Sequence, residues 1–519
     1  MRAGRPGLRH DRVRVVKRAL LGGVLGAAVV AGLLAAVPAS ADGLDTFRDQ
    51  ELTWQTCDDP RLDPVGAQCA DVTVPVDYSA PDGETMTVAI SRLPATDPAR
   101  RRGVLLSNPG GPGGPGLDFV VDIRNAMTPE VAAGYDLIGL DPRGIGRSTP
   151  VNCRWREGFW IESAGFGDAD FAASTVRQGE LAAQCAATEG ARLRHITTRN
   201  TARDMDLIRS VLGEDRISYF GTSYGTYLGA VYTQLFGDHA DRFVLDSAVD
   251  PARYGATEML RDMGPANEAA FDLWADWAAA HAGEYRFGAD RSAVREFVQT
   301  MVRRAKDQPI RIGDFTVDQH DLPNILFAGL DDPRKYPALA GQLRQLADAA
   351  DGATVTPDPE LAATLAFMLR AEPRDLSTAT AVLCGDAASP SDPAWYRRNI
   401  EASRADQPLF GAFTNNITPC AFWALPAEPK TVVDNAVPSL IVQSTGDTRT
   451  TYPGALGMHR ALRESRMVTL PDVPIHWIYG NYPNSCVSTA VNTYLLDGTL
   501  PATDLTCRDE AGPASGATR

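Results

Sequence analysis

The sequence predicts an α/β fold, in which helices flank a mostly parallel sheet and a mainly helical cap interrupts the core. Two observations carry this prediction. Short apolar runs typical of strands alternate with amphipathic patterns typical of helices between residues 103 and 250, and this alternation resumes after residue 435. The stretch between them, 251–434, has helical spacing interrupted by loops that contain proline. We therefore expect a core made of residues 42–250 and 435–519, with a cap over 251–434.

The first 41 residues have the composition of an export signal. Seven basic residues precede an apolar run over 19–37, and Ala39-Ser40-Ala41 supplies the small residues that a signal peptidase accepts. We expect cleavage before Asp42 and a secreted, extracellular protein with no stable membrane association. The alternative is an uncleaved anchor, because a run of about 20 apolar residues can span a bilayer.

The charge of the chain is strongly acidic, which bears on its partners. The 519 residues carry a formal net charge of −15, and the export segment contributes +6, so the remainder carries −21. Such a charge repels nucleic acid and anionic lipid, and neither is expected as a partner. A content of 44% hydrophobic and 22% charged residues is typical of a globular chain.

All eight cysteines follow the predicted signal, and an even number in an exported chain indicates disulfides. Pairing between neighbours along the chain is the simplest arrangement. A zinc site is the alternative, but the sequence has no C-x-x-C and no nearby histidine pair, so we expect no metal. The predicted pairs are Cys57–Cys69, Cys153–Cys185, Cys384–Cys420 and Cys486–Cys507.

The predicted core elements follow in order. An alternating stretch at 86–90 indicates an edge strand, and apolar runs at 103–107, 135–140, 217–220 and 242–245 indicate buried strands. Helices are expected at 201–212 and 224–236, where apolar residues recur every three or four positions. After the cap, strands are expected at 439–443 and 467–470, and a closing helix at 490–496. In the cap, the clearest helical patterns are 266–281, 292–306 and 336–350.

The strongest chemical signal is Gly221-Thr-Ser-Tyr-Gly225, which lies between a predicted strand and a predicted helix. A tight strand-to-helix turn exposes a serine hydroxyl at the edge of the sheet, and small flanking residues relieve crowding there. Because a serine hydroxyl reacts only when a base takes its proton, this turn predicts a nucleophile at Ser223. The alternative is an ordinary turn of glycine and serine.

A loop of glycine and proline, residues 108–116, follows the strand at 103–107. In this architecture an early loop supplies one N–H group for the oxyanion, and the residue after the nucleophile supplies the other. Proline has no N–H, so the possible donors are Gly110, Gly111 and Gly113. We expect Gly111 to act with the N–H of Tyr224. A flexible linker and a phosphate-binding loop are the alternatives, although no Gly-Lys-Ser/Thr follows.

The base and the acid should follow the nucleophile in the chain. His476 lies in a loop after the last long strand, and the other histidines come too early or lie in the cap or on a helical pattern. Asp447 follows the strand at 439–443 and is the expected acid, which holds the imidazole in one tautomer. Asp434 and Asp472 are the alternatives, but one precedes the strand and the other is very close to His476.

These residues resemble the secreted tripeptidyl and related aminopeptidases among the α/β-hydrolases, which are kin of the prolyl aminopeptidases. The resemblance implies an α/β-hydrolase fold, a triad of Ser223, Asp447 and His476, and release of short peptides from free N-termini. Two departures stand out: Trp477 follows the base where the group has glycine, and Arg449 stands where a small residue is usual. The matching stretches are 108–114, 141–148, 219–227, 381–386, 442–447, 452–456 and 479–481, together with Cys486.

An exopeptidase must also hold the α-ammonium group of its substrate, and buried carboxylates do so through charge-assisted hydrogen bonds. The predicted cap offers Asp331, Asp332 and Asp386 among other carboxylates, and Asp386 is the expected amine-binding residue because it lies in one of the matching stretches. We expect peptide substrates and no cofactor. A carboxylic-ester hydrolase with the same triad is the main alternative function, and an inactive binding protein is a further one.

Overall fold

The computed structural model describes residues 43–155, 161–369 and 377–510, so the predicted export signal lies outside the described residues. Nine strands form one sheet in the order β1-β2-β4-β3-β5-β6-β9-β10-β11. β1 and β2 are antiparallel to their neighbours in this sheet. The other seven strands, β4-β3-β5-β6-β9-β10-β11 in sheet order, are parallel to one another. The strands are β1 (Gln68–Pro75), β2 (Thr85–Leu93), β3 (Gly103–Asn108), β4 (Tyr135–Leu140), β5 (Ile217–Thr222), β6 (Ala240–Asp246), β9 (Ser439–Ser444), β10 (Ser465–Leu470) and β11 (Leu505–Thr506).

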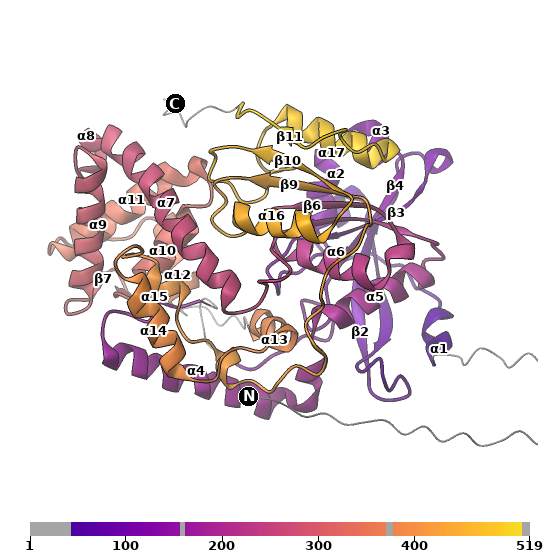
Figure 1. Ribbon diagram of the computed structural model, residues 1–519, viewed down its shortest axis with the longest axis horizontal. Coiled ribbons are helices and arrows are strands. Elements are labelled where there is room, and N and C mark those ends of the chain that lie inside the picture. Colours follow the sequence, from indigo (N-terminus) through magenta and orange to yellow (C-terminus); the bar gives the residue numbers. More distant parts are fainter. Residues whose placement is uncertain (1–42, 156–160, 370–376, 511–519) are drawn as a thin grey trace, which may run out of the picture. The chain divides into compact units, whose positions relative to one another are not determined.

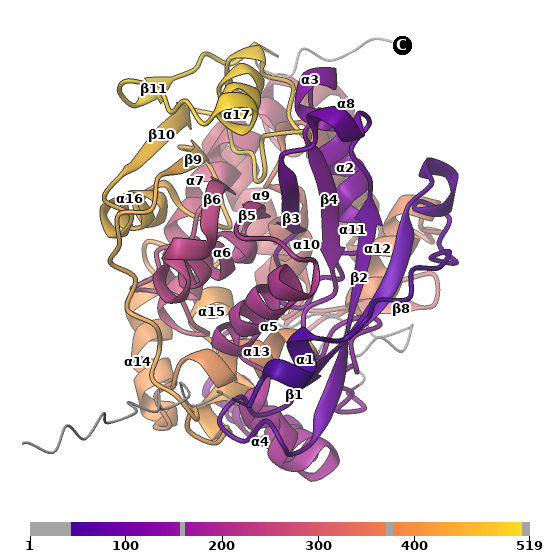
Figure 2. The ribbon, with the colours of Figure 1, turned by 90° about the vertical axis from the view of Figure 1, so that its right-hand side faces the viewer.

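Both faces of the sheet are covered by helices, as expected for parallel strands (Figure 2). Every residue of β3, β5 and β9 is buried. Successive side chains alternate between two clusters, because Tyr219 packs with one set of helices and Phe220 with the other. The first set contains α5 (Thr198–Val211), α6 (Tyr224–Leu235) and α16 (Tyr452–Ala461), and the second contains α2 (Phe119–Ala126) and α17 (Ser485–Asp497).

The cap region has a hydrophobic cluster of its own, with Trp274 fully buried in it. Figure 1 shows its helices gathered beyond the ends of β9 and β10. A short hairpin of β7 (Ile310–Ile312) and β8 (Phe315–Val317) also belongs to this region and was not predicted. The helices are α7 (Glu258–Ala280), α9 (Arg291–Ala305), α10 (Leu322–Gly329), α11 (Tyr336–Ala350) and α12 (Pro359–Met368).

One long helix was missed by the sequence prediction. α4 (Asp168–Glu189) lies between β4 and α5 in the chain and packs against the short helix η6 (Pro419–Phe422). A helix from the predicted first core segment therefore lies beside residues of the predicted cap. α17 begins before the predicted helix, because the Asn484 side chain accepts a hydrogen bond from Val487 N–H and caps the helix there.

All four predicted disulfides are present: Cys57–Cys69, Cys153–Cys185, Cys384–Cys420 and Cys486–Cys507. Each pair joins cysteines that are neighbours along the chain, as predicted. Across residues 43–155, 161–369 and 377–510, no helix combines the length and the apolar character needed to cross a bilayer.

Candidate active site

Ser223 lies on the sharp turn between β5 and α6, as the motif predicted. Its backbone has φ 58° and ψ −126°, a strained conformation for a residue with a side chain. Both flanking glycines are required by close packing. A Cβ at Gly221 would lie 2.5 Å from the carbonyl oxygen of Gly225, and a Cβ at Gly225 would lie 2.7 Å from that of Asn108. The turn therefore presents the hydroxyl at the carboxyl end of the sheet.

The loop after β3 lies directly against this turn. Gly110 has φ 97°, and a Cβ there would lie 2.6 Å from the carbonyl oxygen of Thr222 and 2.8 Å from the Cβ of Ser223. The N–H of Gly110 donates to Asn108 Oδ1 at 2.9 Å. The oxyanion-donor role of Gly110 stays a prediction, and it would require this N–H group to turn from Asn108 to the substrate.

Gly111 and Tyr224, the predicted oxyanion donors, lie on two segments that meet beside Ser223. Tyr224 is the first residue of α6, so its N–H has no partner within the helix. In the described part of the chain, the N–H of Gly111 makes no hydrogen bond. The backbone of Gly110 brings this loop close to the amide of Tyr224, since a Cβ added at Gly110 would lie 3.2 Å from that nitrogen.

Asp447 and His476 are joined as predicted. The His476 Nδ1 atom lies 2.9 Å from Oδ2 and 3.1 Å from Oδ1 of Asp447. The carboxylate is fully buried and also accepts hydrogen bonds from the N–H groups of Arg449 and Thr450 and from the Thr450 hydroxyl, at 2.8, 3.0 and 2.8 Å. Burial alone would raise the pKa of Asp447, but His476 and these N–H groups outweigh it and lower the pKa.

Two residues at the end of β6 hold the loop that carries His476, and neither was predicted from the sequence. Ser247 Oγ accepts from Trp477 N–H at 2.8 Å, and the Asp246 carboxylate accepts from Tyr479 N–H at 2.7 Å. The Asp246 carbonyl accepts from Ser223 N–H at 3.0 Å. Burial raises the pKa of Asp246 to about 7, although backbone N–H groups act in the opposite direction. Its position directly after the predicted strand at 242–245 is the signal that could have indicated it.

The same short segment thus anchors the nucleophile turn and the base loop. Within the described residues, no hydrogen bond joins the hydroxyl of Ser223 to the ring of His476. Catalytic hydrogen bonds are often long in free enzymes and tighten when substrate binds. The structure therefore joins the predicted acid and base directly, and connects the serine to them through Asp246 and Ser247.

The alternative acids lie elsewhere. Asp434 is exposed and pairs with Arg463, and the N–H of Asp472 donates to Thr445. Among the described histidines, His239 and His320 pair with Asp206 and Asp318. Among the histidines that the structure describes, only His476 makes a hydrogen bond or ion pair with Asp447.

Asp386 is buried at the end of α13 (Ser377–Asp386). Its two carboxylate oxygens accept hydrogen bonds from the N–H and the hydroxyl of Thr198, at 2.7 and 2.5 Å. The Thr198 hydroxyl also lies 2.7 Å from that of Tyr224. Burial raises the pKa of Asp386 to about 7 against the effect of the Thr198 hydrogen bonds. The Thr198 hydroxyl thus lies between the carboxylate and the Tyr224 hydroxyl. The amine-binding role of Asp386 stays a prediction.

Trp477, the bulky residue beside the base, has φ 69°. This conformation explains why glycine suits the position in the resembling group. The indole N–H donates to the Tyr479 carbonyl at 2.7 Å, and the ring packs edge-on against Phe119 of α2, with centroids 5.4 Å apart. The side chain of Trp477 is therefore held against α2.

Comparison with known proteins gives matches over most of the chain. A family model described as TAP-like protein matches residues 407–507, and one described as alpha/beta hydrolase fold matches 103–321. A tripeptidyl aminopeptidase of Streptomyces lividans is 36% identical, over 92% of this chain and 89% of that protein. The serine protease Hip1 of Mycobacterium tuberculosis is 28% identical, over 93% and 95%. A protein named carboxylesterase B from the same species is 32% identical, over 85% and 86%.

Proposed function

The chain belongs to the tripeptidyl aminopeptidase-like family of α/β-hydrolases, and from this premise we propose that it is a secreted serine exopeptidase. It releases short peptides, tripeptides first among them, from substrates with a free N-terminus. The observation that carries this proposal is the 36% identity to a tripeptidyl aminopeptidase over 92% of the chain. The four disulfides support export to an oxidising compartment.

In the proposed reaction, the Ser223 oxygen attacks the carbonyl carbon of the scissile amide while His476 takes the hydroxyl proton. Asp447 holds the imidazole with its proton on Nδ1 and stabilises the imidazolium. The N–H groups of Gly111 and Tyr224 donate to the oxyanion. His476 then protonates the leaving amine, and water hydrolyses the acyl-enzyme with the same histidine as base.

Recognition of the free amine is what makes such an enzyme an exopeptidase. A buried carboxylate can hold an ammonium group through charge-assisted hydrogen bonds. Asp386 remains our proposed residue for this role, supported by its burial and its position beside Tyr224. Thr198 uses one acceptor site on each carboxylate oxygen, so lone pairs remain that an ammonium group could use.

A carboxylic-ester hydrolase is the second function, and it is favoured by the 32% identity to the protein named carboxylesterase B. Ester and amide hydrolysis pass through the same acyl-enzyme, so the triad geometry does not distinguish them. Recognition of the substrate amine distinguishes the two functions, because only an aminopeptidase gains from it.

The test compares wild-type protein with Ser223→Ala on three substrates: a tripeptide anilide with a free amine, its N-acetylated form, and a short-chain ester. We expect the free amine to be cleaved much faster than the acetylated peptide, and Ser223→Ala to cleave neither. Equal cleavage of free and blocked peptides, or cleavage of the ester alone, would replace the proposal by the ester hydrolase.

A further inference from the structure

Arg449 lies two residues after Asp447, and its side chain leaves the acid loop to enter the cap region. The guanidinium donates to the carbonyl of Phe327 in α10 and lies 3.3 Å from the centroid of the Phe327 ring. It also forms an ion pair with Asp331 at 3.3 Å, while the side chain is only 13% exposed. Burial lowers the pKa of Arg449, and Asp331 is the charge that most opposes this effect.

Asp331 connects Arg449 to the base. Its carbonyl accepts a hydrogen bond from the N–H of His476 at 3.0 Å. Burial would raise the pKa of the Asp331 carboxyl, but the charges of Arg449 and Lys335 outweigh it and lower the pKa. Because the N–H of Arg449 donates to Asp447 at 2.8 Å, contacts run from the acid through Arg449 and Asp331 to the base.

The backbone of the base is therefore held from two sides. On the core side, Ser247 accepts from Trp477 N–H at 2.8 Å, and on the cap side Asp331 accepts from His476 N–H at 3.0 Å. We propose that Arg449 is a positioning residue, which fixes the 327–331 segment of the cap region against the acid loop and thereby sets the place of His476 relative to Ser223.

This inference rests on the proposed roles of Ser223 and His476, and it adds a link between the cap region and the triad. Without the guanidinium, Lys335 would be the one remaining ion-pair partner of the Asp331 carboxylate among the described residues, and its side chain is 50% exposed. An exposed ion pair is a weak restraint. The 327–331 segment could then shift, and a displacement of the base by about 1 Å costs on the order of 100-fold in rate.

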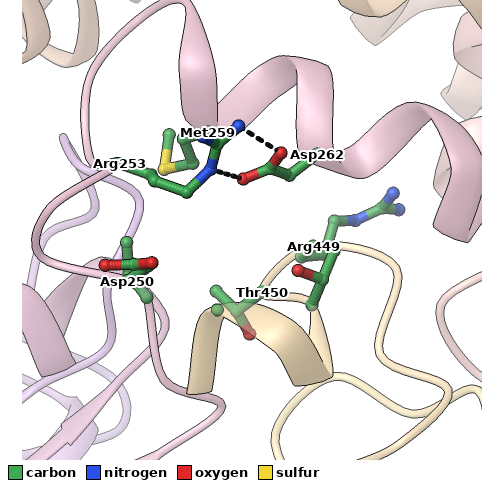
Figure 3. Close-up of a pocket in the computed structure, with 9 residues that line it drawn as sticks. Asp250, Arg253, Met259, Asp262, Arg449 and Thr450 are labelled. Carbon is green, nitrogen blue, oxygen red and sulfur yellow. Dashed lines mark hydrogen bonds and ion pairs between the residues drawn. The ribbon is translucent and has the colours of Figure 1, made fainter. Parts of the chain in front are cut away.

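A matched control lies across a neighbouring cavity, which is shown in Figure 3. There, Arg253 pairs with Asp262 at 2.5 and 2.6 Å and with Glu258 at 2.6 Å. Figure 3 shows the Arg449 guanidinium directed away from this pair. The ion pairs of Arg253 are with α7, and they do not involve the loops of Asp447 or His476. Arg253→Ala therefore removes an arginine and its ion pairs from the same region, and leaves the contacts of Arg449 and Asp331 in place.

The experiment measures the second-order rate at which a fluorophosphonate modifies Ser223, together with kcat, KM and Tm. It uses wild type, Arg449→Ala, Arg449→Lys and Arg253→Ala. We expect Arg449→Ala to lower the modification rate and kcat by about 10- to 100-fold with little change in KM. Arg449→Lys should fall between it and wild type, and Arg253→Ala should match wild type.

Added methylguanidinium at millimolar concentration should restore part of the rate of Arg449→Ala, which a merely structural role would not produce. A wild-type modification rate in Arg449→Ala, an equal loss in Arg253→Ala, or a loss without rescue would overturn the inference. If Arg449→Ala does not fold, the rate of Arg449→Lys decides, since an unchanged rate there contradicts the role of the guanidinium. Fluorophosphonates modify activated serines irrespective of substrate class, so a failed aminopeptidase assignment would leave this result standing.

Discussion

Replacing Asp447 by asparagine changes one carboxylate oxygen into an amide group and leaves the size of the side chain unchanged. The hydrogen-bonding partners of this buried carboxylate among the described residues all act as donors to it. The His476 Nδ1 atom lies 2.9 and 3.1 Å from its oxygens, and Arg449 and Thr450 donate from the backbone. An asparagine must therefore present its NH₂ group to one of them.

The size of the expected loss in kcat depends on which donor the new amide NH₂ group faces. The N–H groups of Arg449 and Thr450 donate to Oδ1, whereas Oδ2 faces His476 and the Thr450 hydroxyl, which can turn and accept a hydrogen bond instead. The amide nitrogen would therefore take the Oδ2 position, 2.9 Å from the imidazole. It would then donate to Nδ1 and force the proton of the ring onto Nε2, where the base must accept one. This tautomer change costs about 10⁴-fold in kcat, or about 5 kcal/mol of transition-state stabilisation.

The assay is steady-state cleavage of a tripeptide anilide by wild type and Asp447→Asn, at a temperature well below the Tm of both proteins. Asp472→Asn and Asp434→Asn are the controls, because neither carboxylate contacts His476 in the described residues. We expect both controls to keep wild-type kcat. A loss below about tenfold in Asp447→Asn, or an equal loss in either control, would refute this assignment of the acid.

Three further predictions concern the oxyanion loop, the buried carboxyl and the disulfides. Gly110→Ala should lower kcat by about 10² or more, since its Cβ would lie 2.8 Å from the Cβ of Ser223; unchanged turnover would contradict this packing. Asp386 has a pKa raised to about 7, so its contribution to the free energy of unfolding is present below about pH 4 and lost as pH rises through 7. Denaturant titrations of Asp386→Asn should show a shallower fall in stability between pH 4 and 7 than wild type, and identical slopes would argue against the raised pKa. The double variant Cys384→Ser and Cys420→Ser opens a loop with a separation of 36 residues and should lose about 4 kcal/mol of stability, measured by chemical unfolding.

The parts that could be predicted from sequence depend on local rules. Gly221 is required by the carbonyl of Gly225 within the same motif, so this part of the G-x-S-x-G pattern predicts its turn locally. Gly225 is required by the carbonyl of Asn108 at the end of β3, a contact that the spacing of the motif does not show. The bounds of β4 agree with the prediction because its apolar run ends at a loop of glycine and proline. The disulfides were predictable because each cysteine pairs with its neighbour along the chain.

The parts that could not be predicted depend on contacts between distant segments. Asp246 holds the N–H of Ile478, which lies 232 positions away, and no spacing in the sequence connects the two. Phe327 accepts from Arg449 across 122 positions, so Arg449 appeared only as a departure from the resembling group. The hydrogen bond from the N–H of Gly110 to the Asn108 side chain is local, but nothing in the composition of the loop indicates it.

The central claim is that the Ser223 oxygen is activated by His476, and an N-terminally free tripeptidyl chloromethyl ketone tests it most directly. Such a reagent is attacked by the active-site serine and alkylates the base beside it. We expect inactivation of the wild-type protein with the adduct on His476 by mass spectrometry, and much slower alkylation in Ser223→Ala. An adduct on another residue, or an unchanged alkylation rate without the serine hydroxyl, would contradict the account.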